Sequence, residues 1–249
     1  MSGKHSKNAL KHALPKPKRT TFDKARLIVA STFIAAGLGI GGYLAYQTFI
    51  PTTIEIAEQQ AAASEFIESF ETEVGTPVKY DKNDPPVTDR VAHAVPFGVI
   101  YIPRLDPNFK RVIAEGTTLR DVLSQGVGHY EDSQMPGEIG NFAVAGHRDS
   151  AFPNLKSVVP GDLIYVQTAQ GYYTYKVTAE HYIVTPDAIE VTYPVPNEPG
   201  VVPTESIITL TTCWPEWSNT ERLILHATFL EWRPLAAGPP AAIKSAVNS

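Results

Sequence analysis

The single cysteine of the chain, Cys213, lies where two predicted strands meet. It ends an apolar, β-branched run, residues 206–212, that predicts a buried strand, and Pro215 prevents that strand from continuing as a paired ladder. A second apolar run, residues 222–229, follows a short loop and starts with Arg222. Only the thiolate of a cysteine attacks well, and a nearby cation favours the thiolate. The pattern predicts a thiol nucleophile beside an arginine at one rim of a sheet.

A thiol nucleophile needs an acid–base partner, and several histidines are candidates. His147 follows a predicted strand, residues 141–145, and a glycine; histidine suits proton transfer because its ordinary pKa is about 6.5. Spacing alone does not choose among His129, His147 and His226. For Arg222 we expect a role as oxyanion donor and substrate clamp, because guanidinium keeps its charge and offers a planar fork of donors.

Inert interpretations of the same residues remain open at this point. A lone cysteine is often a small, buried and unreactive side chain. Arg222 can simply pair with Glu221 or Glu216, and exposed ion pairs contribute little. A group of acidic residues is more simply a solvated loop face than a Ca²⁺ site, and we expect no metal and no cofactor. These acids are Glu131, Asp132 and Glu138.

A basic tail and an apolar segment precede the elements that position these residues. The chain has 249 residues and a formal net charge of −5, yet residues 1–26 hold eight Lys or Arg and one acid. The remainder is therefore acidic, which argues against nucleic acid as a partner. Residues 27–50 carry no charge and would form a helix about 36 Å long, enough to span a bilayer. Because the lysines precede this span, we expect a cytoplasmic amino end and an extracellular domain on a single-pass membrane protein.

The sequence divides into five expected parts. They are a cytoplasmic basic tail (1–26), a transmembrane signal anchor (27–50), an extracellular stalk and linker (51–96), a catalytic domain (97–233) and a flexible C-terminal tail (234–249). Within the domain, short apolar runs are separated by Gly and Pro, and one alternating run, residues 172–184, predicts a longer strand. This pattern predicts a mainly β fold, closed into a barrel of about eight strands with short helices.

Two motifs resemble those of the sortases, the cysteine transpeptidases of Gram-positive bacteria. They are T-L-T-T-C, followed nine residues after the cysteine by R-L-I-L-H-A, and the upstream N-F-A-V-A-G-H-R. The resemblance covers residues 97–229 and implies that His147, Cys213 and Arg222 are the catalytic residues, which settles the choice of histidine. The short loop between cysteine and arginine is most similar to class E of actinobacteria, whereas H-R-D after the strand is also seen in class D.

The resemblance implies a reaction and its partners. Such an enzyme cleaves an LAxTG- or LPxTG-like sorting signal of a secreted protein between Thr and Gly, through a thioacyl-enzyme. It then joins the Thr carbonyl to an amine of a lipid-linked peptidoglycan precursor at the membrane. We also expect four further residues to contact the substrate. They are Thr212, His129, Tyr130 and Trp214.

Three other functions remain possible from the sequence. The acceptor amine can belong to a pilin, which would make the enzyme a pilin-polymerising sortase. A papain-like peptidase is disfavoured because such enzymes place the cysteine before the histidine, whereas His147 precedes Cys213 here. A membrane-tethered β-barrel that only binds peptides would keep Cys213 inert, and slow alkylation of the thiol would identify it.

Overall fold

The computed structural model describes residues 20–70 and 79–249, which form two units, residues 1–50 and 51–249. Helix α1 (Thr21–Glu68) begins in the first unit and ends in the second. Most of the basic tail predicted for residues 1–26 lies outside the described residues.

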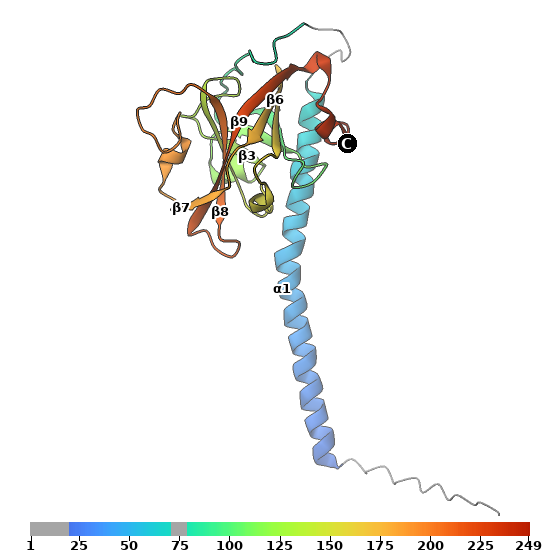
Figure 1. Ribbon diagram of the computed structural model, residues 1–249. Coiled ribbons are helices and arrows are strands. Elements are labelled where there is room, and N and C mark those ends of the chain that lie inside the picture. Colours follow the sequence, from blue (N-terminus) through green and yellow to red (C-terminus); the bar gives the residue numbers. More distant parts are fainter. Residues whose placement is uncertain (1–19, 71–78) are drawn as a thin grey trace, which may run out of the picture. The chain divides into compact units, whose positions relative to one another are not determined.

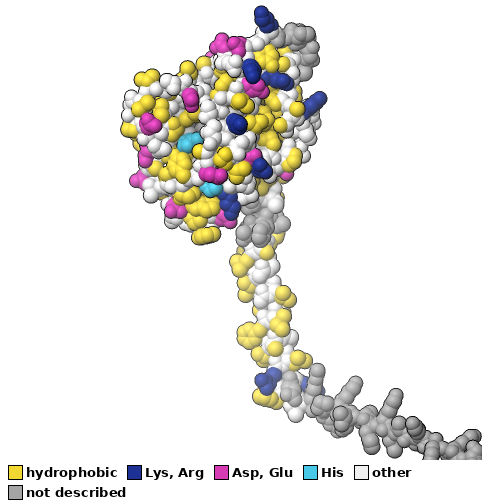
Figure 2. All heavy atoms as spheres, in the orientation of Figure 1, with side chains coloured by type: hydrophobic (Ala, Val, Ile, Leu, Met, Phe, Trp, Pro, Cys, Tyr) yellow, Lys and Arg dark blue, Asp and Glu magenta, His cyan; other side chains and the backbone are white. Residues whose placement is uncertain are grey.

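Among the described residues, one helical segment, Lys24–Tyr46, is long and apolar enough to cross a membrane. Its large apolar side chains, such as Phe33 and Leu38, are exposed, and they give this segment its hydrophobic surface (Figure 2). A long helical segment that is apolar all round is typical of a buried helix or of a membrane span. The segment coincides with the predicted anchor, residues 27–50, and is compatible with membrane attachment.

The second unit is built on one nine-stranded sheet (Figure 1). The strands are β1 (Pro96–Tyr101), β2 (Arg111–Glu115), β3 (Val127–His129), β4 (Gly140–Gly146), β5 (Leu163–Thr168), β6 (Gly171–Val177), β7 (Tyr182–Val184), β8 (Ser206–Trp214) and β9 (Glu221–Pro234). Their order is β6-β5-β1-β2-β3-β4-β8-β9-β7, and β9 also pairs with β6. This second pairing closes eight strands into a barrel, which confirms the predicted fold class.

Short helices connect or follow the strands. They are η1 (Leu119–Leu123), η2 (Leu155–Ser157), η3 (Ile189–Thr192), η4 (Leu235–Ala237), η5 (Ala241–Ile243) and α2 (Lys244–Val247). Two neighbouring strand pairs, β2–β3 and β4–β8, are parallel, and the others are antiparallel. The parallel pair β4–β8 is important for the site, because it brings the carboxyl ends of two strands to the same edge of the sheet.

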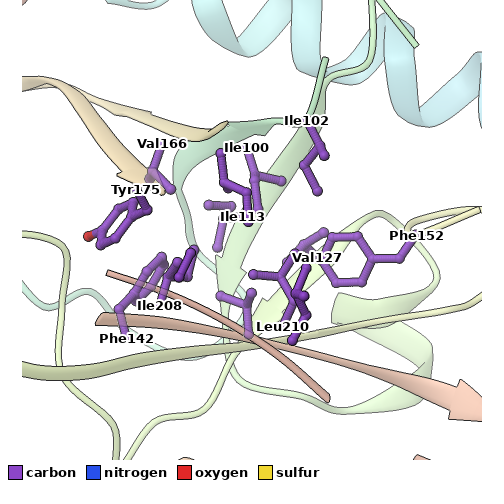
Figure 3. Close-up of a cluster of buried hydrophobic side chains, with 14 of the residues drawn as sticks. Ile100, Ile102, Ile113, Val127, Phe142, Phe152, Val166, Tyr175, Ile208 and Leu210 are labelled. Carbon is purple, nitrogen blue, oxygen red and sulfur yellow. The ribbon is translucent and has the colours of Figure 1, made fainter. Parts of the chain in front are cut away.

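The barrel is filled by apolar side chains that alternate with outward-facing ones along the strands. Figure 3 shows Ile100, Ile113 and Leu210 gathered with Val127 in this core, and all four are at most 1% exposed. Phe152 belongs to the same cluster although it comes from the loop after β4. The loop is therefore fixed to the barrel interior by a large aromatic side chain.

The strand predicted for residues 172–184 is present as two segments. Both β6 and β7 pair with β9, and Val177 lies opposite Ala227 while Tyr182 lies opposite Ile224. Four residues, 178–181, therefore stand against two residues of β9, so the ladder is interrupted there. Alternation of apolar and polar residues continues across such an irregularity, which is why the sequence predicts a single strand.

The end of α1 is packed on the barrel instead of forming a separate stalk. Gln59 is 2% exposed and Ala63 is fully buried, and Ala63 lies in a second apolar cluster with Tyr101 and Tyr165 of the barrel. An alanine and a glutamine do not stand out in a hydrophobicity pattern. The stalk predicted for residues 51–96 is therefore helical as far as Glu68, and this part of it packs on the barrel.

The C-terminal segment also differs from its prediction as a flexible tail, residues 234–249. Ile243 is fully buried and Ala246 is 1% exposed, both in the cluster that holds the end of α1. Lys110 donates hydrogen bonds from its Nζ to the carbonyl oxygens of Ala246 (2.8 Å) and Ser249 (3.1 Å). The structure therefore folds this segment back onto the barrel (Figure 1), through contacts to residues more than 130 positions earlier in the sequence.

Candidate active site

Strand register brings together the three residues that the sequence assigns to catalysis. In the antiparallel pair β8–β9, Cys213 lies opposite Arg222. In the parallel pair β4–β8, the last paired residues are Ala145 and Thr211, and His147 and Cys213 each follow two positions later. Neighbouring strands are about 4.8 Å apart. His147, Cys213 and Arg222 therefore stand at one end of three adjacent strands.

Gly146 lets the backbone approach the side chains of Ala151 and Phe152 closely just before His147. A Cβ atom at Gly146 would lie 2.8 Å from Cδ2 of Phe152 and 2.9 Å from Cβ of Ala151, distances too short for side chains buried in the core. The backbone N–H of Phe152 donates to the carbonyl oxygen of His147 (2.8 Å). His147 thus begins a tight loop whose other end, Phe152, is fixed in the barrel.

His147 differs from the other two candidate histidines in what its ring contacts. Within residues 20–70 and 79–249, no hydrogen bond involves the imidazole of His147, and this residue is half-buried. His129 is fully buried, with Nδ1 at 2.8 Å from Oε1 of Glu115 and Nε2 at 2.8 Å from Oγ of Ser133. The ring of His129 is enclosed and both nitrogens have partners, which does not support the predicted contact of His129 with substrate.

His226 is also engaged inside the fold. Its Nδ1 lies 2.7 Å from Oγ1 of Thr209, and its Nε2 lies 2.8 Å from the hydroxyl of Tyr182. Burial lowers the pKa of His226 to about 4. The ring is therefore neutral near pH 7 and serves to connect strands, so among the three candidate histidines His147 is the one with a free ring.

Arg148, beside His147, makes hydrogen bonds to the loop between Cys213 and Arg222. Its Nη1 donates to the carbonyl oxygen of Pro215 (3.2 Å) and to that of Ser218. One guanidinium thus connects the loop that carries His147 to the loop that follows Cys213. The sequence alone gives no role to Arg148; its only signal is a permanent cation directly after the histidine.

Thr212 and Trp214 flank the cysteine on β8. Thr212 is 5% exposed, and its Oγ1 donates to the carbonyl oxygen of Gly146 (2.8 Å), so its hydroxyl is used between strands. Trp214 is half-buried and lines a small recess of about 30 Å³ together with Cys213. Lys156 lies over its ring, 5.8 Å from the centroid. Of the two, Trp214 keeps the surface that a substrate could touch.

Arg222 has no carboxylate partner among the described residues. Its Nη1 donates to the backbone oxygens of Asn219 (3.0 Å) and Glu221 (2.9 Å), while the carboxylate of Glu216 pairs with Lys156. The inert interpretation, an ion pair with Glu221 or Glu216, is therefore not what the structure has. The guanidinium is oriented by carbonyl groups and keeps its charge available at the edge of a groove.

This groove is a cavity of about 430 Å³ beside Arg222. Its floor contains Thr211, Arg222 and Ile224, and one wall contains Tyr130, whose hydroxyl lies 3.1 Å from Oγ1 of Thr211. The opposite wall is formed by residues 184–194, which precede β8. The volume lies in the range of pockets that hold a small ligand or a few residues of a peptide.

A polar network fastens that opposite wall to the sheet. The buried amide of Asn141 donates to the carbonyl oxygens of Val191 and Tyr193, both at 3.0 Å. Its Oδ1 accepts a 2.6 Å hydrogen bond from Thr209, which also contacts His226. The groove wall therefore depends on side chains of β4, β8 and β9, none of which is recognisable from local sequence.

The three acids considered for a cation have other partners or none. Glu131 accepts from Nδ1 of His93 (2.8 Å), and this hydrogen bond is the main cause that raises the pKa of His93. Glu138 accepts from the backbone N–H of Met135 (2.7 Å). Asp132 is exposed. All three acids lie in loops between strands.

The family model called Sortase domain matches residues 100–230, more than half of the chain. The chain belongs to the sortase family. Sortases are cysteine transpeptidases. The match covers every strand from β2 to β8 and most of β9, so the sortase domain is the barrel described above together with its site.

Individual sortases support the class E resemblance. The chain is 30% identical over 226 residues to sortase SrtE1 of Streptomyces coelicolor, an alignment that covers 87% of this chain and 60% of that relative. The SrtA sortase from Actinomyces oris has a TM-score of 0.61 and 39% identity, covering 64% of this chain and 93% of that one. Sortase E from Streptomyces avermitilis has a TM-score of 0.56 and 35% identity, covering 61% and 99%. This sortase is therefore class E-like, as its motifs indicate.

Proposed function

We propose that this sortase is a membrane-anchored transpeptidase for secreted proteins with an LAxTG- or LPxTG-like sorting signal. The observation that carries the proposal is the register of β4, β8 and β9, which brings His147, Cys213 and Arg222 to one end of three adjacent strands, where Arg222 also lines a peptide-sized groove. Among the described residues, the imidazole of His147 has no hydrogen-bond partner and Arg222 has no carboxylate partner, and the Cys213 thiol is free. These are the groups that acyl transfer through a cysteine requires.

In the first half-reaction, the Cys213 thiolate attacks the carbonyl carbon of the Thr–Gly bond. Arg222 and backbone N–H groups near Thr212 stabilise the oxyanion. The C–N bond breaks as His147 gives a proton to the leaving glycine amine, and a thioester between Sγ and the Thr carbonyl remains. In the second half-reaction, an amine of a lipid-linked peptidoglycan precursor attacks the thioester, loses its proton to His147 and releases the thiolate. Two half-reactions through one covalent intermediate give ping-pong kinetics.

The position of the groove supports substrate contacts for part of the predicted set. Tyr130 and Trp214 border the groove and the recess, so they are proposed to contact the sorting signal. Thr212 contributes through the strands, since its hydroxyl bonds Gly146. No residue of this mechanism requires a metal or a cofactor.

The direct test uses the full chain in detergent micelles. It is incubated with LAxTG and LPxTG peptides and a glycine-bearing amine, and the products are identified by mass. We expect a thioacyl adduct and an amine-joined product, both absent in Cys213→Ala. Arg222→Ala should lower kcat by roughly a hundredfold or more, the usual cost of losing an oxyanion donor. Absence of any adduct, together with slow alkylation of Cys213, would refute the proposal and leave a peptide-binding barrel.

The proposed topology has its own test. Cys213 is the only cysteine of the 249 residues, so it reports the location of the domain. A membrane-impermeant maleimide added to intact cells should label Cys213 if the domain is extracellular and the amino end cytoplasmic. Labelling only after the cells are permeabilised would contradict this orientation.

A further inference from the structure

The end of α1 reaches the loop that carries His147. Within the second unit, Oε1 of Glu55 accepts a 2.7 Å hydrogen bond from Oγ of Ser150, and Nε2 of Gln59 lies 3.4 Å from the same Oγ. Ser150 is fully buried and stands three residues after His147. Two residues one turn apart on α1 therefore contact the side chain of Ser150.

The backbone of Ser150 is held separately. Arg111 of β2, which is 2% exposed, donates to the carbonyl oxygen of Ser150 from Nε (3.0 Å) and Nη2 (2.8 Å). Burial lowers the pKa of Arg111 to about 10, while the charges of Asp106 and Glu55 act in the opposite direction. The guanidinium is thus a buried cation whose charge the helix carboxylate helps to balance. Ser150 is fixed at its backbone by the barrel and at its side chain by the helix.

These contacts leave little freedom to the residues between Gly146 and Phe152. Gly146 is bonded to Thr212 at one end, and Phe152 is packed in the core at the other. Ser150 is the one buried polar side chain between them, and its partner comes from an element 95 residues earlier in the sequence. Loss of that partner would leave the buried hydroxyl hydrogen of Ser150 without an acceptor and would release the middle of the loop.

We propose that Glu55 is a positioning residue for His147, so that the helix continuing from the membrane anchor is a brace of the active site. The hydrogen bond from Ser150 to Glu55 holds the His147 loop in the geometry that aligns the imidazole with Cys213. This inference rests on the catalytic role proposed for His147 and Cys213. It also means that the end of α1 belongs to the functional enzyme and is more than a spacer between membrane and domain.

The test compares variants of the full chain in detergent micelles with the peptide and amine assay. Glu55→Ala and Ser150→Ala should each lower kcat about tenfold with KM within about twofold, because a geometry that positions a reacting group affects the chemical step. The double variant should be no slower than either single one, since both changes remove the same interaction. Glu55→Gln keeps an acceptor oxygen for Ser150 but not the charge that balances Arg111, so it should restore most of the lost kcat. Glu58→Ala, an exposed acid of the same helix, is the matched control and should be unchanged.

Hydrogen exchange of residues 147–152 supplies a second measurement that does not depend on activity. Exchange should become faster in Glu55→Ala than in Glu58→Ala. Parental kcat in Glu55→Ala, additive losses in the double variant, or a Glu55→Gln variant as slow as Glu55→Ala would each overturn the brace while leaving the transpeptidase intact. An inactive parent with altered exchange in Glu55→Ala would instead refute the proposed function and keep the contact as a structural brace.

Discussion

Thr212 donates a 2.8 Å hydrogen bond from its Oγ1 to the carbonyl oxygen of Gly146. The residue immediately before Cys213 is thereby bonded to the residue immediately before His147. Because side chains alternate along a strand, a slip of one residue between β4 and β8 would turn one of the two reacting groups to the wrong face. The hydroxyl of Thr212 therefore fixes the register where the proposed chemistry depends on it.

Replacement of Thr212 by valine should expose this dependence. Thr212→Val keeps the shape of the side chain but leaves a buried carbonyl oxygen without its donor, a loss of about 1–3 kcal/mol in the free energy of unfolding. We expect kcat to fall about tenfold, and Thr212→Ser to remain near the parent because it keeps the hydroxyl. Steady-state kinetics and urea unfolding of both variants measure this. An increase in KM with unchanged kcat would instead assign Thr212 to substrate contact.

Arg148 should affect the rate of the reaction, because it connects the loop of His147 to the loop between Cys213 and Arg222. Arg148→Met removes the donors to the carbonyl oxygens of Pro215 and Ser218 and frees the loop between Cys213 and Arg222. Because that loop orients both the thiol and the guanidinium, we expect kcat to fall roughly tenfold to a hundredfold with a smaller change in KM. Arg148→Lys should recover only part of the loss, since the ammonium is more strongly hydrated and its nitrogen does not lie where Nη1 of the guanidinium lies.

The matched control for this substitution is Arg120→Met. Arg120 is an exposed arginine of η1, outside the strands that carry His147, Cys213 and Arg222. The kcat of Arg120→Met should equal that of the parent. Equal kcat values for Arg148→Met and Arg120→Met would show that the hydrogen bonds from Arg148 to Pro215 and Ser218 do not affect the reaction.

The sequence was sufficient for the hairpin that carries Cys213 and Arg222. Both residues border strongly apolar runs separated by a proline-containing loop, and such local signals predict strands and their ends well. The closed barrel followed from the same kind of signal. Spacing could not choose among the histidines, because the choice depends on contacts distant in sequence. His129 and His226 are occupied by partners 14 and 44 residues away, respectively, in Glu115 and Tyr182.

The packing of the chain ends was not predictable for a related reason. Ala63 and Ala246 are buried in one cluster although alanine carries a weak hydrophobic signal, and the linker and tail were therefore expected to be free. The groove wall is a similar case, since Asn141 holds Val191 from a distance of 50 residues. Polar networks of this kind are specified by the folded geometry and leave no periodic pattern in the sequence.

The network behind the groove wall should act on substrate binding. Thr209→Val preserves the shape of a buried side chain but removes the donor to Asn141 and the acceptor for His226. The wall would then be held less firmly, so we expect KM for the sorting-signal peptide to rise about fivefold to tenfold with kcat changed less than about twofold. Thr204→Val, an exposed threonine of the segment before β8, is the control. A fall in kcat without a change in KM would contradict this role.

His226 should make the domain sensitive to acid. The hydroxyl of Thr209 donates a hydrogen bond to Oδ1 of Asn141, so Thr209 can only accept from Nδ1 of His226. Nε2 of His226 then accepts a hydrogen bond from the hydroxyl of Tyr182. This arrangement needs a neutral ring, in agreement with a pKa that burial lowers to about 4. An unfolded histidine takes up its proton near pH 6.5, so the unfolded state binds more protons between about pH 6.5 and pH 4. Stability from this residue is therefore complete above about pH 6.5 and falls as the pH is lowered towards 4.

The measurement compares urea unfolding of the parent and of His226→Gln at pH 7.5 and pH 4.5, so that the titration of all other groups cancels. Between these pH values the parent should lose on the order of 2–3 kcal/mol more of its free energy of unfolding than the variant does. The variant begins from a lower stability at pH 7.5, because glutamine does not bridge Thr209 and Tyr182 equally well. Equal losses for the two proteins would mean that His226 is protonated in the folded state at pH 4.5 without cost, and that the groove wall tolerates a charged ring.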